Sequence, residues 1–179
     1  MSLIIGVRCK NGCLVIADRR THIKCGGTQS HRDDFHKVVK QDGYLVWNHG
    51  YNRIGDQDWK LLASQLTPDP TSPVFAEIQN EMKTKSDRKA SYVFMNMTTL
   101  SEVIVCADTG ITLKDHMPND RIVSGSGDKY VALTFLTNLP KKSCGDVRKP
   151  VERTFKSAHA KMTNQGGMEF SEEYDITRL

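Results

Sequence analysis

The sequence predicts an α+β fold for this chain of 179 residues. Apolar, β-branched segments of strand length recur along the chain, and segments with apolar residues at helical period lie between and after them. Hydrophobic residues make up 38% of the sequence, and no tract is of low complexity. A chain of this length buries roughly 70% of its unfolded surface, so a single domain over residues 1–179 is expected.

The clearest element is a β-hairpin at the N-terminus. Residues 3–9 and 13–17 are apolar and rich in β-branched side chains, and the sequence Lys10-Asn11-Gly12 between them is typical of a tight turn. Antiparallel pairing about this turn places residues 2–4 opposite residues near 18–20. The segment 21–36 is polar and is expected to be a loop.

The rest of the chain alternates in type. Strands are expected at 38–39 and 44–48, helices at 51–66 and 74–85, strands at 90–96, 101–107 and 121–124, helices at 128–136 and 150–162, and a closing segment at 168–176. Prolines at 68, 70 and 73 separate the first two helices.

Ser2 is the residue with the clearest chemistry. A small residue after the initiator Met allows an aminopeptidase to remove Met1, which leaves a serine with both a hydroxyl and a free α-amine. An α-amine titrates near ~7.7–8.0, so it can accept the hydroxyl proton at neutral pH. Nucleophile and base then belong to one residue. A serine at the second position is also common without any such role.

The chain resembles a known family. Its motifs occur in order: the hairpin Gly6-Val7-Arg8-Cys9-Lys10-Asn11-Gly12, Ala17-Asp18-Arg19-Arg20-Thr21, Phe35-His36-Lys37-Val38, Asn48-His49-Gly50, Val123-Ser124-Gly125-Ser126-Gly127, and Gln165-Gly166-Gly167. Together with the serine at the second position, they resemble the β-type subunits of the proteasome and their bacterial relatives of the HslV and Anbu kind. These proteins are N-terminal-nucleophile hydrolases, and the resemblance extends from residue 2 to about 176.

The resemblance implies a specific fold. Its members are four-layer αββα sandwiches, in which two stacked sheets lie between two helical layers. The expected order of elements in this chain matches that architecture.

The resemblance also implies roles for the residues around Ser2. Lys37 is similar to the family's active-site lysine, which keeps the α-amine unprotonated; Lys24 and Lys40 are the alternatives, because the preceding loop is longer than in the relatives. Asp18 would hold that lysine in an ion pair, although an acid at the end of a strand is also a common turn residue.

Three further residues match the family pattern. Arg20 would brace the loop beside the site, or else be a solvated charge. Gly50 would present its N–H to the oxyanion, or else form an ordinary turn. Ser126 would hydrogen-bond the amine of Ser2, and the alternative is a structural strand-to-helix turn.

Two positions depart from the pattern. Where the family has an acid and a serine before its Gly-Gly turn, this chain has Met162 and Gln165. Either Asn164 or Gln165 orients Ser126 in their place, or the site is weakened.

Three functions are therefore open. The first is a peptidase or amidase that acts inside a self-compartmentalising ring or helical assembly of identical chains, with an ATPase unfoldase as the partner that delivers substrate. The second is a catalytically inactive structural or binding subunit, which the two departures would explain. The third is a transpeptidase of the connectase type, because the opening Met1-Ser2-Leu3-Ile4-Ile5 is similar to that of those enzymes.

Composition narrows the remaining classes. The net charge of +4 is mild and scattered without interleaved aromatic residues, so no nucleic-acid partner is expected. Five cysteines without a CxxC pair and six unclustered histidines suggest neither a metal site nor a cofactor. A cytoplasmic protein with no membrane partner is expected, since no apolar run reaches about 18 residues. Some apolar residues of the expected helices 51–66 and 74–85, such as Trp59, Leu62 and Phe75, are expected at contacts between subunits.

Overall fold

The computed structural model describes residues 2–25, 28–85, 87–117, 119–131 and 139–179. The chain forms two compact units: residues 1–37 and 120–179 build the first, and residues 38–119 build the second. The first unit therefore joins the N-terminal hairpin to the last third of the chain. The predicted α+β class is confirmed, and the single domain over 1–179 stays a prediction.

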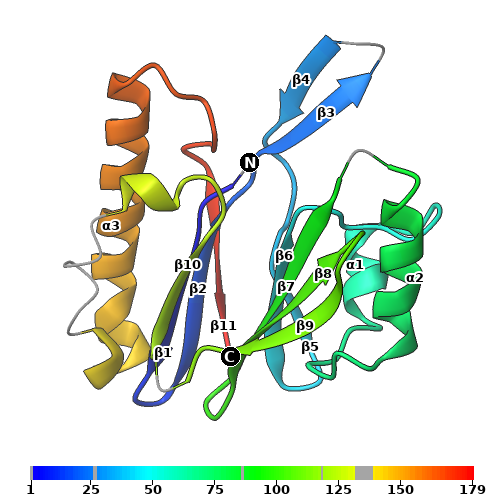
Figure 1. Ribbon diagram of the computed structural model, residues 1–179. Helices are drawn as coiled ribbons and strands as arrows, with labels where there is room; N and C mark the ends of the chain where they lie inside the picture. The colour runs from blue at the N-terminus through cyan, green and yellow to red at the C-terminus, as the bar shows by residue number, and fades with distance from the viewer. Residues whose placement is uncertain (1, 26–27, 86, 118, 132–138) are drawn as a thin grey trace. The chain divides into compact units, whose positions relative to one another are not determined.

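The sheet of the first unit has four antiparallel strands in the order β10-β1-β2-β11 (Figure 1). Their bounds are β1 Ile4–Cys9, β2 Gly12–Asp18, β10 Arg121–Ser124 and β11 Tyr174–Arg178. The predicted N-terminal hairpin is confirmed, since Ile4 pairs with Ala17 and Cys9 with Gly12. The last strand pairs with β2, so the C-terminal segment completes the sheet as expected.

The long helix α3 (Cys144–Asn164) covers one face of this sheet (Figure 1). Its buried side chains recur every three or four residues, as in Val151, Phe155, Ala158 and Met162. They form one apolar core with alternate residues of the two central strands, including Leu3, Ile5, Val7, Leu14 and Ile16. Burying such a side chain contributes about 1.5–3 kcal/mol.

The helix α3 begins earlier than the sequence analysis expected. The side chain of Ser143 caps it by accepting a hydrogen bond from the N–H of Asp146, and Pro150 lies inside the helix and not at its start. The expected helix 128–136 begins as a single 3-10 turn, η1 (Asp128–Tyr130), and residues 132–138 lie outside the described part. A second 3-10 turn, η3, spans Leu139–Lys141.

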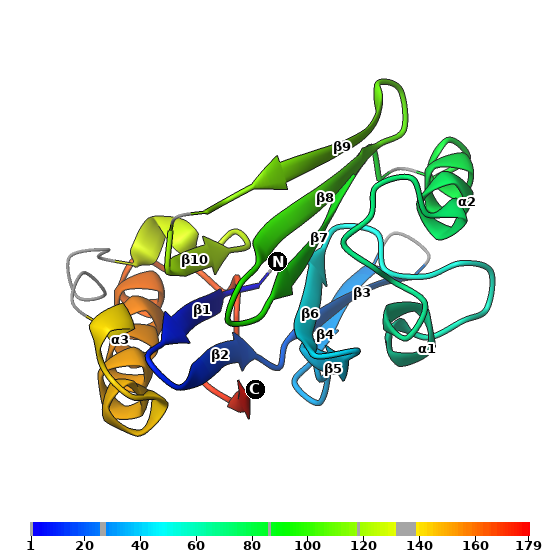
Figure 2. The ribbon, with the colours of Figure 1, turned by 90° about the horizontal axis from the view of Figure 1, so that it is seen from below.

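The expected loop at 21–36 is wrong over most of its length. Strands β3 (Thr21–Cys25) and β4 (Thr28–Arg32) pair as a separate antiparallel hairpin (Figure 2). The sequence does not indicate this hairpin, because its residues are mostly polar and do not alternate with apolar ones.

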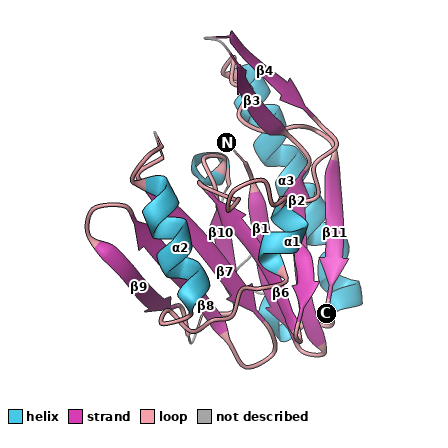
Figure 3. Ribbon diagram, turned by 90° about the vertical axis from the view of Figure 1, so that its right-hand side faces the viewer, coloured by secondary structure: helices cyan, strands magenta, loops and turns pink. Residues whose placement is uncertain are grey.

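The sheet of the second unit has five antiparallel strands in the order β5-β6-β7-β8-β9 (Figure 3). Their bounds are β5 Val39–Gln41, β6 Tyr44–His49, β7 Lys89–Met95, β8 Leu100–Cys106 and β9 Gly110–Asp115. The first four confirm the sequence analysis, which missed β9. That edge strand is partly or fully exposed, and its two large apolar residues, Ile111 and Leu113, form too short an alternation to indicate a strand.

Helices α1 (Trp59–Ala63) and α2 (Pro73–Met82) belong to the second unit. The expected helix 51–66 is reduced to α1, because Asp58 caps a helix that starts only at Trp59. Trp59, Leu62 and Phe75 are 3%, 0% and 0% exposed, so the expectation that they form subunit contacts is wrong. Phe75 packs against Tyr92 of the sheet, with ring centroids 5.6 Å apart.

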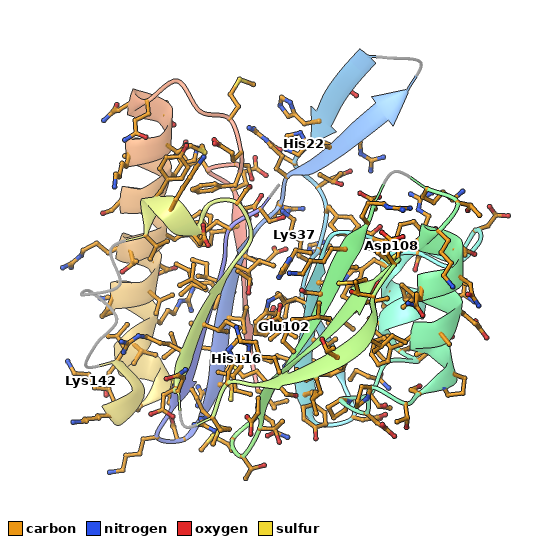
Figure 4. The ribbon with its side chains drawn as sticks, viewed as in Figure 1. His22, Lys37, Glu102, Asp108, His116 and Lys142 are labelled. Atoms are coloured by element: carbon orange, nitrogen blue, oxygen red, sulfur yellow. The ribbon has the colours of Figure 1, made fainter. Side chains whose placement is uncertain are left out.

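A cluster of polar side chains lies on the sheet of the second unit. Glu102 on β8 accepts a hydrogen bond from His116, with Nε2 and Oε2 3.0 Å apart, and its Oε1 lies 3.6 Å from Nε2 of His49 (Figure 4). The His49 interaction is the largest cause that lowers the pKa of Glu102 to about 2, against the opposing effect of burial; Ser91 and His116 add to it. Glu102 is therefore ionised at neutral pH. It lies beside His49, the residue before Gly50.

None of the helices in the described ranges combines the length and the apolar character that crossing a bilayer requires.

We predict that Glu102→Gln lowers the free energy of unfolding at pH 7 by about 1–3 kcal/mol, because a hydrogen-bonded charge on a side chain that is only 12% exposed is lost. A carboxyl with a lowered pKa stabilises the fold above its ordinary value of 4.5, and this contribution is lost as the pH falls toward about 2. Urea unfolding from pH 7 to pH 3 should therefore show the gap between wild type and variant closing. Glu77→Gln, at an exposed position of α2, is the control, and an equal effect there would refute the prediction.

Candidate functional site

Ser2 lies two residues before β1, and hydrogen bonds hold it and the next residue, Leu3, in place. The carbonyl oxygen of Ser2 accepts a hydrogen bond of 2.9 Å from the N–H of Gly127, and Leu3 forms two hydrogen bonds with Asp18. The N–H of Leu3 donates to Oδ1 of Asp18 at 2.8 Å, and the N–H of Asp18 donates to the carbonyl of Leu3 at 3.1 Å. The backbone at Ser2 is thus fixed in the first unit.

The turn Gly125-Ser126-Gly127 approaches Ser2 so closely that its glycines have no room for a side chain. Gly125 has a φ of +94°, and a Cβ there would clash with the carbonyl oxygen of Ser2. A Cβ on Gly127 would lie 2.8 Å from Cβ of Leu3 and from the ring of Phe170. The glycines are therefore required by contact with the N-terminal residues.

The structure brings Lys37 to Asp18, as the sequence analysis expected. Nζ of Lys37 donates to Oδ1 of Asp18 at 2.7 Å, and the two side chains are 6% and 0% exposed. The segment reaches this place because the N–H of Phe35 donates to the carbonyl of Arg19. Of the two alternatives, Lys40 is an exposed residue of β5 in the second unit, and the side chain of Lys24 lies outside the described part.

Burial lowers the pKa of Lys37 from its ordinary value of 10.5, and the adjacent carboxylate of Asp18 opposes this shift. Asp18 also accepts a hydrogen bond of 3.0 Å from the N–H of Arg20 at Oδ2. One buried carboxylate therefore binds two main-chain N–H groups and one ammonium. A buried lysine with a lowered pKa and a specific charged partner is typical of functional sites.

Arg20 forms a second ion pair of the same region. Its Nε and Nη2 each lie 2.8 Å from an oxygen of Asp33, and Nη1 donates to the carbonyl of Met168 at 3.2 Å. The pairing lowers the pKa of Asp33. The hydrogen bonds to Asp33 connect Arg20 to the loop that it was expected to brace, and its role at the site stays a prediction. Asp33 was missed, because an acid within a polar segment gives no sign of a partner 13 residues away.

Ser126 has a buried hydroxyl without a hydrogen-bond partner among the described residues. Asn164 and Gln165, the two groups considered for orienting it, are both exposed at the C-terminal end of α3. Met162 is 1% exposed and packs in the core of the first unit. The carboxylate next to Met162 is that of Glu169, since a Cβ built on Gly167 would touch both side chains.

Gly50 belongs to the second unit, directly after β6. Its φ is +92°, and a Cβ there would lie 2.5 Å from the carbonyl oxygen of Lys89. The backbone conformation and the close approach to Lys89 therefore require glycine at this position, whatever its catalytic role. Its role as an oxyanion donor stays a prediction.

Within the described residues, no three His, Cys, Asp or Glu side chains are grouped in a way that could hold a metal ion. Cys9, Cys13 and Cys144 are buried free thiols, and burial raises the pKa of Cys13 to about 11. These thiols are therefore poorly reactive. The polar groups of this region include the hydroxyls of Ser2 and Ser126 and the ion pairs Lys37–Asp18 and Arg20–Asp33.

The chain is similar in fold to solved structures of Anbu proteins. Anbu (ancestral beta-subunit) from Yersinia bercovieri matches with a TM-score of 0.64 and 11% identity over 98% of this chain and 81% of that chain. An Anbu (Gly-1) mutant from Hyphomicrobium sp. strain MC1 matches with a TM-score of 0.55 and 10% identity, over 100% and 82% of the two chains. No protein-family model and no curated protein matches. The likeness supports the Anbu kind at the level of the fold, and not the HslV or proteasomal kind specifically.

We predict that Asp18→Asn lowers the free energy of unfolding by about 3–5 kcal/mol, because a buried ion pair loses one partner. Lys37→Met should cost less, about 1–3 kcal/mol, since Asp18 keeps the N–H groups of Leu3 and Arg20. Without Asp18, the pKa of Lys37 falls further, so stability should rise with pH between that lowered pKa and 10.5. Urea unfolding from pH 6 to pH 10 measures both effects.

The matched control for this prediction is Asp108→Asn. Asp108 pairs with Arg88 at a similar distance of 2.8 Å, but its side chain is 62% exposed (Figure 4). An exposed pair contributes about 0–1 kcal/mol. Equal losses in the Asp18 and Asp108 variants would contradict the proposed importance of burial.

Proposed function

We propose that this chain is a proteasome-like N-terminal-nucleophile peptidase or amidase that uses Ser2 once Met1 has been removed. One observation carries the proposal: the buried carboxylate of Asp18 binds both the N–H of Leu3, next to Ser2, and the ammonium of Lys37. This contact joins the N-terminal residue to a lysine 35 positions along the chain. The fold likeness to Anbu proteins supports the same reading.

In this proposal, Oγ of Ser2 attacks the acyl carbon of a peptide or protein substrate while its own α-amine accepts the hydroxyl proton. The amine passes that proton to the leaving nitrogen as the C–N bond breaks, which leaves an ester on Ser2. Water then cleaves the ester and restores the serine. The ammonium of Lys37 disfavours protonation of the α-amine, which keeps it a base at neutral pH.

Ser126 and Gly50 complete the proposed site. The hydroxyl of Ser126 is a free acceptor for the N–H groups of the mature α-amine, since it is buried without a partner among the described residues. The N–H of Gly50 is assigned to the oxyanion on the basis of the sequence resemblance. Loss of such a donor costs about 2.7–4 kcal/mol of transition-state stabilisation.

We further propose that the two sheets stack as the inner layers of an αββα sandwich. Each sheet has one apolar face packed with helices and a second face that is also apolar, with Ile4, Val15 and Ala17 in the first unit and Trp47, Val93 and Met95 in the second. An apolar sheet face must be covered by another layer. The Anbu likeness over nearly the whole chain supports this arrangement.

An assembly of identical chains, a cytoplasmic location and delivery of substrate by an ATPase unfoldase belong to the same proposal. Leu61, Met97 and Leu113 are 51%, 45% and 49% exposed, and side chains of this size commonly lie at contacts between subunits. They replace the three buried residues that the sequence analysis assigned to such contacts.

A catalytically inactive subunit is the second candidate. Met162 is buried among apolar side chains. Gln165 is exposed at the end of α3 and forms no hydrogen bond with the hydroxyl of Ser126. A site that has lost both supporting groups would keep the fold and lose the reaction. The experiment on Ser2 separates the two candidates.

We predict that the chain beginning at Ser2 hydrolyses amide or peptide reporters, and that Ser2→Ala abolishes this activity without changing the fold. Attack requires a hydroxyl on the residue that carries the α-amine, and alanine lacks it. Ser2→Thr and Ser2→Cys should keep part of the activity, because both supply a nucleophile at the same place. Steady-state kinetics, with intact mass of an inhibitor adduct on Ser2, is the measurement.

The control is a chain that retains Met1, in which the α-amine of Ser2 is blocked by the peptide bond. Activity in that chain, or in Ser2→Ala, would refute the nucleophile. A wild-type chain with a verified Ser2 N-terminus that forms no adduct would establish the inactive subunit instead.

We predict that Lys37→Ala raises the apparent pKa of the basic group in the pH–rate profile and lowers the rate of acylation by about 10²-fold or more. Without the ammonium of Lys37, the α-amine is protonated more readily, so the acid limb of the profile moves to higher pH. Asp18→Asn should have a smaller effect, because it lowers the pKa of Lys37 and so weakens its charge without removing the side chain. Lys40→Ala is the control, and a shift of equal size there would move the role away from Lys37.

A further inference from the structure

Glu169 is a charged residue that the proposed mechanism does not use. It follows the Gly166-Gly167 turn, and its side chain is 14% exposed. Its Oε1 accepts two hydrogen bonds of 2.9 Å, one from Nζ of Lys129 and one from the hydroxyl of Tyr130. Both donors come from the turn η1.

The carboxylate of Glu169 packs over Gly167. A Cβ built on Gly167 would clash with Oε2 of Glu169, and it would lie 2.8 Å from Cγ of Met162 and 3.1 Å from the hydroxyl of Tyr130. Oε2 is buried, and no described side chain donates to it. The pairing with Lys129 lowers the pKa of Glu169, so the carboxylate is ionised at neutral pH. A substitution at Gly167 would displace this fixed negative charge.

Tyr130 connects Glu169 to the N-terminal residue. The N–H of Tyr130 donates to the carbonyl of Gly127 at 3.1 Å, and the N–H of Gly127 donates to the carbonyl of Ser2 at 2.9 Å. The neighbour of Glu169, Phe170, also fills the space over Gly127. An unbroken series of contacts therefore runs from the carboxylate through the turn that carries Ser126 to Ser2.

We propose that Glu169 is a positioning residue of this site: through Tyr130 it holds the turn 125–130 against Ser2, and with Lys129 it sets the charge at that end of the site. The inference rests on the proposed function and deepens it. Two further titratable groups lie at this loop: His22, whose ring lies at the main-chain carbonyl of Glu169, and Arg20, which donates to the carbonyl of Met168.

The first test is kinetic and uses the full chain beginning at Ser2. Glu169→Gln should lower kcat for an amide reporter by about 10- to 100-fold, because a small displacement of a positioned group is costly. KM should change by no more than about twofold, since the residue does not bind substrate. Tyr130→Phe removes a single hydroxyl with little risk to folding and should have a similar effect. The double variant should lose no more than the worse single variant.

The matched control is Glu172→Gln, which makes the same chemical change at an exposed acid three residues away. It should change kcat by no more than about twofold. A loss in the control equal to that in Glu169→Gln would overturn the proposal.

The second test distinguishes positioning with a charge effect from loss of structure alone. Glu169→Gln leaves the ammonium of Lys129 unpaired, which should lower the pKa of the Ser2 α-amine. Lys129→Gln leaves the carboxylate unpaired, which should raise that pKa. The pH dependence of labelling by a small amine-acylating reagent, read on the N-terminal peptide by mass spectrometry, reports the pKa directly. Unchanged midpoints, or shifts of the same sign in both variants, would overturn the proposal.

The labelling experiment does not depend on hydrolysis, so it also separates the two proposals. If Ser2→Ala kept its activity, or if the wild type had none, the proposed function would fail, while opposite shifts in the two variants would still support the role of Glu169. If Ser2→Ala abolished activity and the shifts were absent, the function would stand and this inference would fail.

Discussion

The arrangement of the site depends on one buried carboxylate. Asp18 has no exposed surface, and such a group is stable only where charged or polar donors surround it. Its three donors come from Leu3, Arg20 and Lys37, which belong to the N-terminus, the end of β2 and a segment beyond the β3–β4 hairpin. The three hydrogen bonds that stabilise the buried charge of Asp18 therefore also fix these segments relative to one another. Positioning and stability have the same physical source here.

The second constraint is the close approach of the turn at 125–127. Two glycines allow this turn to contact Ser2 and Leu3, and a hydrogen bond from Gly127 holds it there. The N-terminal residue is thus fixed from the side of Asp18 and from the side of the turn. Ser2 leads into β1, a central strand of the sheet, and these contacts fix its backbone before that strand begins.

The sequence predicted the parts of the fold that have a strong apolar pattern. The hairpin of β1 and β2 and most strands of the second sheet follow from alternation and turn residues. The β3–β4 hairpin was missed because most of its side chains are polar, and β9 was missed because its alternation of apolar residues is confined to Ile111 and Leu113. The same reason explains Asp33, whose partner Arg20 is fixed by tertiary contact and by no local pattern.

The departures at positions 162 and 165 show why a site is more difficult to infer than a fold. Sequence comparison asks which residue occupies a position, whereas the chemistry depends on which group reaches a place. Met162 fills the core, and the carboxylate beside it comes from Glu169, seven residues later on a different segment. At 11% identity, a likeness to known structures establishes the course of the backbone. The charges that act on Ser2 must then be derived from this chain's own contacts.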